Sequence, residues 1–162
     1  MNGPFAAGLG VLAAAAVTAV AARRLLLVVT VKGTSMTPTF APGQRLVVLR
    51  TPAARPRTGA VVVFRLPPRE GGEVPAPRQP LVVKRLVARG GDPVPDGVLP
   101  AVAARPGDLV PEGSLVLLGD DPATSSDSRD WGYLEARRVS GVVLGRLRGR
   151  ARQPRQQRDA DA

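Results

Sequence analysis

The chain turns at Gly33-Thr34-Ser35-Met36-Thr37-Pro38-Thr39, a proline-stiffened segment that directly follows an apolar run. Hydroxyl residues between a glycine and a proline are typical of a tight turn. Such a segment is either a plain structural turn or a turn that presents the Ser35 hydroxyl as a nucleophile. The predicted strands before and after this turn indicate the fold. The other motifs in the chain indicate whether the Ser35 hydroxyl is a nucleophile.

Short runs of β-forming residues lie before and after this turn, separated by proline and glycine. No amphipathic helix lies between them, and closely spaced strands without crossover helices indicate an all-β, largely antiparallel domain. Proline- and glycine-rich stretches at 67–80 and 92–111 are predicted to be loops. The predicted strands cover residues 25–31, 44–50, 60–66, 81–88, 114–118 and 139–147.

Composition limits the chemistry that this domain can perform. The 162 residues suffice for one domain with a modest core. The chain has no histidine and no cysteine, which excludes Ser-His and Cys-His catalysis and histidine-ligated metal sites. A serine nucleophile would therefore need a lysine or a carboxylate as its base, and lysine is the better attested of the two.

Lysine is rare in this chain, because arginine is its ordinary cation. Of 23 basic residues only Lys32 and Lys84 are lysines. Lys84 lies within the apolar run Leu81-Val82-Val83-Lys84-Arg85-Leu86-Val87, with Val82 and Leu86 on the same strand face. A desolvated lysine amine can lose its proton, whereas an arginine cannot. Lys84 is thus a candidate base; the alternative is a lysine with a buried stem and a hydrated ammonium group.

The N-terminal segment predicts a membrane anchor. Residues 3–22 carry no charge and are rich in alanine, valine and leucine, and about 20 helical residues cross a hydrocarbon core of about 30 Å. A cleavable signal peptide is the alternative, because Ala19-Val20-Ala21 resembles a cleavage site; the missing basic start and the length of the run favour a retained anchor. Arg23, Arg24 and Lys32 would place the domain in the cytoplasm by the positive-inside rule.

The formal charge of +10 does not by itself indicate a nucleic-acid partner. Only 3% of the residues are aromatic, and no reading helix or stacking sheet is visible. Much of the positive charge lies instead in a C-terminal segment, residues 148–162, which is predicted to be disordered. This tail either is a solvated charge run or rests on anionic lipid.

A loop dense in hydroxyls and carboxylates follows the predicted strand 114–118. It runs from Gly119 to Gly132 and contains the only tryptophan. One interpretation is a Ca²⁺ site, although the aspartate spacing does not match an EF-hand loop, and a second is a polar turn. In a third, its hydroxyls and the Asp127/Arg129 pair hold a buried amine in place. The loop carboxylates are Asp120, Asp121, Asp127 and Asp130.

Four segments resemble, in order and spacing, those of the type I signal peptidases, which are membrane-anchored Ser/Lys endopeptidases. The resemblance extends from the anchor to about Leu147. Phe40 and Asp121 stand where leucine and asparagine are usual, and the third segment lacks the customary proline. The segments are Ser35-Met36-Thr37-Pro38-Thr39-Phe40, Gly59-Ala60-Val61-Val62-Val63-Phe64, Val83-Lys84-Arg85-Leu86-Val87 with Gly91-Asp92, and Gly119-Asp120-Asp121 through Ser125-Ser126-Asp127-Ser128-Arg129 and Gly132.

The resemblance implies a role for each matching residue. Ser35 would be the nucleophile, with its own amide as one oxyanion donor, and Lys84 would be the general base. Ser125 would hydrogen-bond the Lys84 amine. Asp127 and Arg129 would fix the loop. No cofactor and no metal is implied.

Two further positions follow from the same resemblance. Arg85 would be structural. Gly33 stands where some relatives carry a helpful hydroxyl, so a side-chain oxyanion donor is not implied here.

The whole chain is therefore predicted to comprise a transmembrane anchor (1–24), a β-rich Ser/Lys protease domain of signal-peptidase type (25–147) and a basic tail (148–162). The implied function is cleavage of exported preproteins after a small-x-small site, on the extracytoplasmic face of the plasma membrane. Its partners would be preprotein signal peptides and membrane lipid. The alternatives are a protease of the same fold dedicated to one substrate, a cytoplasmic self-cleaving domain like that of LexA-type repressors, and a catalytically idle membrane-anchored β-domain.

Overall fold

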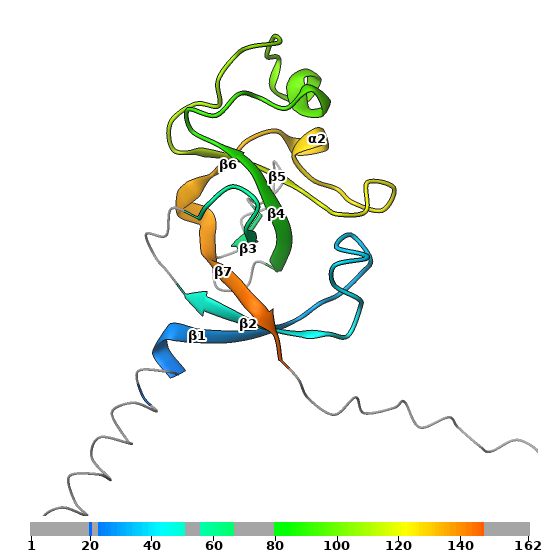
Figure 1. The fold of residues 1–162 in the computed structure, drawn as a ribbon, viewed down its shortest axis with the longest axis vertical. Coiled ribbons are helices and arrows are strands. Elements are labelled where there is room, and N and C mark those ends of the chain that lie inside the picture. The colour runs from blue at the N-terminus through cyan, green and yellow to red at the C-terminus, as the bar shows by residue number, and fades with distance from the viewer. Residues whose placement is uncertain (1–19, 21–22, 51–55, 67–79, 148–162) are drawn as a thin grey trace, which may run out of the picture.

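The computed structural model describes residues 20, 23–50, 56–66 and 80–147 (Figure 1). Nearly all of the predicted anchor lies outside these residues, as do most of the predicted 67–80 loop and the whole basic tail. Within the described ranges, no helix has both the length and the hydrophobicity needed to cross a membrane.

The described residues form one seven-stranded sheet with the order β1-β2-β7-β3-β4-β5-β6. Every neighbouring pair is antiparallel, which confirms the predicted strand-rich, antiparallel fold. The strands are β1 (Leu26–Thr30), β2 (Arg45–Arg50), β3 (Val61–Arg65), β4 (Leu81–Arg89), β5 (Ser114–Leu118), β6 (Leu134–Glu135) and β7 (Val139–Arg146).

The six longer strands match the predicted ones to within one residue at either end. The prediction was wrong at Leu25, which is helical, and it missed β6, because two residues cannot show an alternating pattern. The predicted 92–111 connection also contains a 3₁₀ helix, η2 (Asp96–Val102). Short 3₁₀ segments tolerate proline and glycine and so leave little trace in a sequence.

Three bulges curl the sheet. The pairing register shifts between Val47 and Val48 in β2, between Val63 and Phe64 in β3, and between Leu86 and Ala88 in β4. Bulges increase the local twist of a strand, and the curled sheet of Figure 1 thereby encloses apolar side chains on both of its faces. In β3, four consecutive residues from Val61 to Phe64 are buried, so a plain in-out alternation does not hold there.

The nucleophile candidate lies where the core meets the surface. Ser35 is half-buried, while its neighbour Met36 is only 1% exposed and packs in the same cluster as Phe40 and Val48. Burial of the Met36 side chain anchors the turn to the sheet, because a fully buried side chain of this size stabilises by about 1.5–3 kcal/mol. The turn that carries Ser35 is thus held at a defined place.

Candidate active site

Lys84 lies in the middle of β4 with its side chain enclosed by the core. It is 3% exposed, it pairs in register with Val62, and Leu86 on the same face is fully buried. The alternative of a hydrated ammonium group is therefore wrong. Burial lowers the pKa of Lys84 from its usual value, the charge of Asp127 opposes this shift, and the charge of Arg129 adds to it. A lowered pKa is what a lysine base requires.

Ser125 connects this amine to the polar loop. Lys84 Nζ donates a hydrogen bond of 2.6 Å to Ser125 Oγ, and Ser125 Oγ donates one of 2.6 Å to Asp127 Oδ2. The hydrogen bond predicted between Ser125 and Lys84 is present. A serine hydroxyl has one proton, and the Ser125 hydroxyl donates it in the hydrogen bond to Asp127. Ser125 can therefore only accept a hydrogen bond from the Lys84 amine. Asp127 therefore determines which partner donates in the hydrogen bond between Lys84 and Ser125.

Asp127 is fully buried and ionised. Arg129 donates to both of its oxygens, at 2.9 and 2.6 Å, and the amide of Gly119 donates at 2.8 Å. Burial by itself would raise the pKa of Asp127, but the hydrogen bonds from Arg129, Gly119 and Ser125 lower it to about 2. Asp127 is also the N-cap of the short helix α2 (Ser128–Trp131), in a capping box with Asp130. The predicted Asp127/Arg129 pair is thus present and holds the loop.

Ser35 approaches the loop through its backbone. Its carbonyl accepts a hydrogen bond of 3.1 Å from the amide of Asp121. A Cβ atom added to Gly119 would clash with Ser125 Oγ and lie 2.6 Å from the Ser35 carbonyl oxygen. Ser35 and Ser125 therefore both crowd the side of Gly119 on which a Cβ atom would lie, so only glycine fits at this position.

The Ser35 hydroxyl and the Lys84 amine are not hydrogen-bonded to each other in the structure. Among the described residues, neither Ser35 Oγ nor the Ser35 amide has a recorded hydrogen-bond partner, and Lys84 Nζ donates to Ser125. The Ser35 hydroxyl and amide are thus both available to a bound molecule. Gly33, two residues earlier, has a φ of 77° and so uses a conformation that glycine adopts without strain.

Arg85, the next residue in β4, ties the turn to the same loop from outside. It donates to both oxygens of Asp120, at 2.8 and 2.7 Å, to the Gly59 carbonyl at 2.9 Å and to Thr39 Oγ1 at 3.3 Å. One guanidinium thereby joins four separate segments, which fits the structural role that the resemblance implies.

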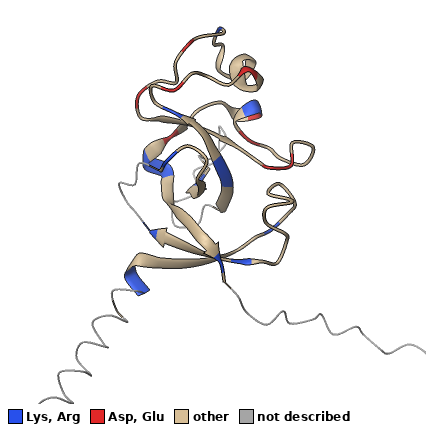
Figure 2. Cartoon of the chain, in the orientation of Figure 1, with Lys and Arg blue, Asp and Glu red and all other residues tan. Residues whose placement is uncertain are grey.

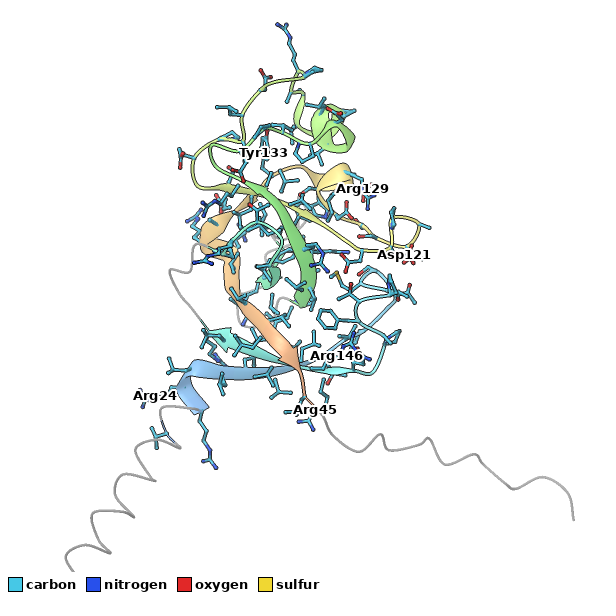
Figure 3. The ribbon with its side chains drawn as sticks, in the orientation of Figure 1. Arg24, Arg45, Asp121, Arg129, Tyr133 and Arg146 are labelled. Atoms are coloured by element: carbon cyan, nitrogen blue, oxygen red, sulfur yellow. The ribbon has the colours of Figure 1, made fainter. Side chains whose placement is uncertain are left out.

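The loop carboxylates serve as acceptors for protein donors. Asp120 pairs with Arg85, Asp127 with Arg129, and Asp130 accepts from the amide of Asp127. Figure 3 shows Asp121 and Arg129 on this loop, opposite the turn that carries Ser35. These contacts favour the scaffold interpretation over a Ca²⁺ site, and within the described part of the chain no three acidic side chains are grouped as metal ligands.

A pocket of about 370 Å³ opens next to Ser35. Its two long walls are the end of β1 with the residues after it, and the first residues of β4. Most of the side chains that line it are apolar. The lining residues are Val29, Thr30, Val31, Lys32, Ser35, Met36, Pro80, Leu81, Val82 and Val83.

Sequence reasoning missed several contacts of this site. It did not foresee the close approach at Gly119, the hydrogen bond from Thr34 Oγ1 to Thr124 Oγ1, or the buried Ser128 hydroxyl that accepts from the Leu117 amide. A glycine at the end of a strand and hydroxyls beside the nucleophile were visible. Their partners lie far away in the sequence, so no local pattern pointed to them.

Comparison with known proteins gives a family match that extends over most of the chain. The family described as "Signal peptidase, peptidase S26" matches residues 6–95 and 98–147. Among solved structures, the chain is similar to a signal peptidase I from Enterococcus faecalis V583, with 24% identity over 55% of this chain and 97% of that chain, and a TM-score of 0.34. No curated protein sequence matches significantly.

Proposed function

The chain belongs to the signal peptidase family, peptidase S26, which matches most of its length, and from this premise we propose that Ser35 and Lys84 form its catalytic dyad. The family assigns a peptidase of the signal peptidase I type. The observation that carries the proposal is the burial of Lys84 together with its hydrogen bond to Ser125. In a chain without histidine or cysteine, this amine is the best base available to a serine nucleophile.

The hydrogen bonds of Lys84 and Ser125 support transfer of the Ser35 proton to the Lys84 amine. A neutral Lys84 amine that donates to Ser125 keeps its lone pair free for the proton of Ser35. Ser35 Oγ then attacks the scissile carbonyl carbon, and its proton passes to Lys84 Nζ. The tetrahedral intermediate collapses to an ester on Ser35 while the Lys84 ammonium protonates the leaving amine. Water attacks the ester with Lys84 again as base, which restores both residues.

The backbone amide of Ser35 is the proposed oxyanion donor. It has no recorded acceptor among the described residues, and its carbonyl is held by Asp121. A fixed amide aimed at the developing negative charge stabilises the transition state without reorganisation.

The pocket beside Ser35 fits an extended peptide. β4 pairs with β5 only from Arg85 onward, so residues 81–84 have one edge with no strand partner in the described sheet. β1 is an edge strand, and the residues around Val29 and Val31 form the opposite wall. A peptide that runs between two such edges gains backbone hydrogen bonds. The mostly apolar lining suits small apolar side chains such as alanine, in agreement with a small-x-small cleavage site.

The proposed membrane location agrees with the chemistry of one end of the domain. Leu25, Val28 and Leu144 are 53%, 43% and 59% exposed. Figure 3 shows Arg24, Arg45 and Arg146 at this same end, while the acidic segments of Figure 2 lie mainly in the loops at the other. Apolar side chains beside arginines suit an anionic lipid surface. We propose a single-pass protein of the plasma membrane with this end against the bilayer and the domain outside.

Incubation of the detergent-solubilised full chain with a preprotein that bears an Ala-x-Ala site tests the function. N-terminal sequencing should place the cut after the second alanine, and Ser35→Ala and Lys84→Ala should each abolish it. Cleavage that survives either substitution would overturn the dyad. A panel of unrelated preproteins decides between general processing and a protease dedicated to one substrate.

Digestion of the domain by protease added outside intact cells tests the location. The domain should be cut despite Arg23 and Arg24. Protection would favour the cytoplasmic alternative.

A further inference from the structure

Three side chains of the loop and the turn form a hydrogen-bonded ring around the backbone of the nucleophile. Thr34 Oγ1 donates to Thr124 Oγ1 at 2.9 Å, and Thr124 Oγ1 donates to Asp121 Oδ2 at 2.8 Å. The amide of Asp121 donates to the Ser35 carbonyl at 3.1 Å. Because Thr34 and Ser35 are joined covalently, these three contacts close a ring.

The direction of the donors gives this ring its strength. Each hydroxyl has one proton, and both point the same way, toward a carboxylate. A carboxylate at the end of a hydroxyl chain polarises both links and strengthens them. Asp121 Oδ1 also accepts from the Ala123 amide at 3.1 Å, so the carboxylate is held from its other side.

We propose that Thr34, Thr124 and Asp121 act as a clasp that positions the Ser35 turn against the loop that carries Ser125. This inference rests on the proposed roles of Ser35 and Lys84. The two segments are 90 residues apart in the chain, and the Ser35 carbonyl and Ser125 Oγ both lie close to Gly119. A displacement of about 1 Å between reacting groups can cost about 100-fold in rate.

The other contacts to the turn do not hold Thr34 or the Ser35 carbonyl against the loop that carries Ser125. Arg85 reaches Thr39, four residues beyond the nucleophile. Met36 anchors the core side of the turn. Only the clasp holds the exposed side, at Thr34 and at the Ser35 carbonyl, among the contacts recorded for the described residues.

Valine substitutions test the clasp, since valine matches the shape of threonine but lacks its hydroxyl. Thr34→Val and Thr124→Val in the full chain should each lower kcat about 3- to 10-fold with little change in KM. The double variant should resemble Thr124→Val alone, because residues in one hydrogen-bond network are not additive. Thr34→Ser and Thr124→Ser keep the hydroxyl and should retain at least half of the activity. Additive losses, or serine variants as impaired as the valine variants, would overturn the clasp.

Thr58 provides a matched control. Its hydroxyl is also exposed and also donates to a distant aspartate, Asp92 Oδ2, at 3.1 Å. Thr58→Val should leave kcat unchanged. A loss equal to that of Thr34→Val would show that any surface threonine has this effect and would refute the proposal.

Hydrogen exchange separates this inference from the proposed function. The Asp121 amide should exchange faster in Thr34→Val than in the wild type, while the Gly119 amide, held by Asp127, should not. Equal exchange at Asp121 refutes the clasp even in an active enzyme. If the wild type does not cleave preproteins, the proposed function fails, and the exchange rates still decide whether the clasp exists.

Discussion

Lys84 and Arg85 are adjacent in β4 and have opposite surroundings. The Lys84 side chain points into the core, is 3% exposed and donates to a neutral hydroxyl. The Arg85 side chain points outward, is 31% exposed and pairs with the Asp120 carboxylate at 2.7 Å. Burial without a directly paired anion lowers the pKa of Lys84, whereas the hydrogen bond to Asp120 raises the pKa of Arg85. One strand thus holds a potential base on one face and a permanent cation on the other.

The difference teaches that residue type and environment must agree. A guanidinium keeps its proton in any protein environment and offers a planar fork, which suits the bidentate contact at Asp120. An amine is compact and titrates when it is desolvated, which suits the interior of the sheet. Lys84→Arg should therefore impair catalysis, whereas Arg85→Lys should mainly lower the stability of the fold.

The largest effect is expected from Lys84→Arg. The charge is kept, but no base remains, so kcat should fall about 10⁴-fold or more. Initial rates of preprotein cleavage measure it, with circular dichroism to verify folding. Turnover within 10-fold of the wild type would break the comparison, because a guanidinium would then be doing what we assign to a neutral amine.

The next largest effect is expected from Gly119→Ala. The added methyl group would clash with Ser125 Oγ and crowd the Ser35 carbonyl, which should push the Ser35 turn and Ser125 out of their present positions. The rate should fall about 100-fold while the outward face of β4, with its Arg85 contacts, stays intact. Gly97→Ala is the control, since nothing lies within 4 Å of that position and its φ is ordinary. An unimpaired Gly119→Ala enzyme would contradict the close approach.

Acid should destabilise the loop by about 2 kcal/mol through Asp127. Its pKa is lowered to about 2 in the folded chain from an ordinary value of 3.8. A carboxyl with a depressed folded pKa contributes stability that is complete above about pH 4 and is lost as pH falls through about 2. Denaturant unfolding between pH 5 and pH 2 measures this slope. An equal slope in Asp127→Asn would show that other carboxylates cause it.

Arg85→Lys is expected to have the smallest effect and is the mirror of the first substitution. Lysine keeps the charge but loses the bidentate contact, so unfolding free energy should fall by about 1 kcal/mol, since the pair is partly exposed. The pH profile of kcat should keep its shape, because Arg85 lies on the strand face opposite Lys84. A shift of the acid limb of this pH profile would show that Arg85 changes the pKa of Lys84. The two faces of β4 would then not be independent.

The strands could be predicted from the sequence almost completely. Runs such as residues 81–88 and 139–147 are rich in β-branched residues, and such runs are a local signal for a strand. The short helices could not be predicted. The four residues of α2 depend on the capping box between Asp127 and Asp130, and one turn is too short to show a helical period.

The candidate site could also be predicted only in part from the sequence. The absence of histidine, the rarity of lysine and the hydroxyl on the Ser35 turn are facts about residue types, and they were enough to select Ser35 and Lys84. Whether Lys84 was dry or hydrated stayed open, because amphipathic side chains can reach water from an apolar strand. The curl of the sheet settled it by burying the amine at 3% exposure.

By itself, then, the sequence determined which strands form and which side chains can do chemistry, since both depend on the intrinsic properties of neighbouring residues. Only the tertiary structure decided which distant groups meet: Thr34 with Thr124, Arg85 with Asp120, and the Ser35 carbonyl with Gly119. Such contacts depend on strand register and on bulges, where a shift of one residue turns every side chain to the other face. No local pattern encodes that choice.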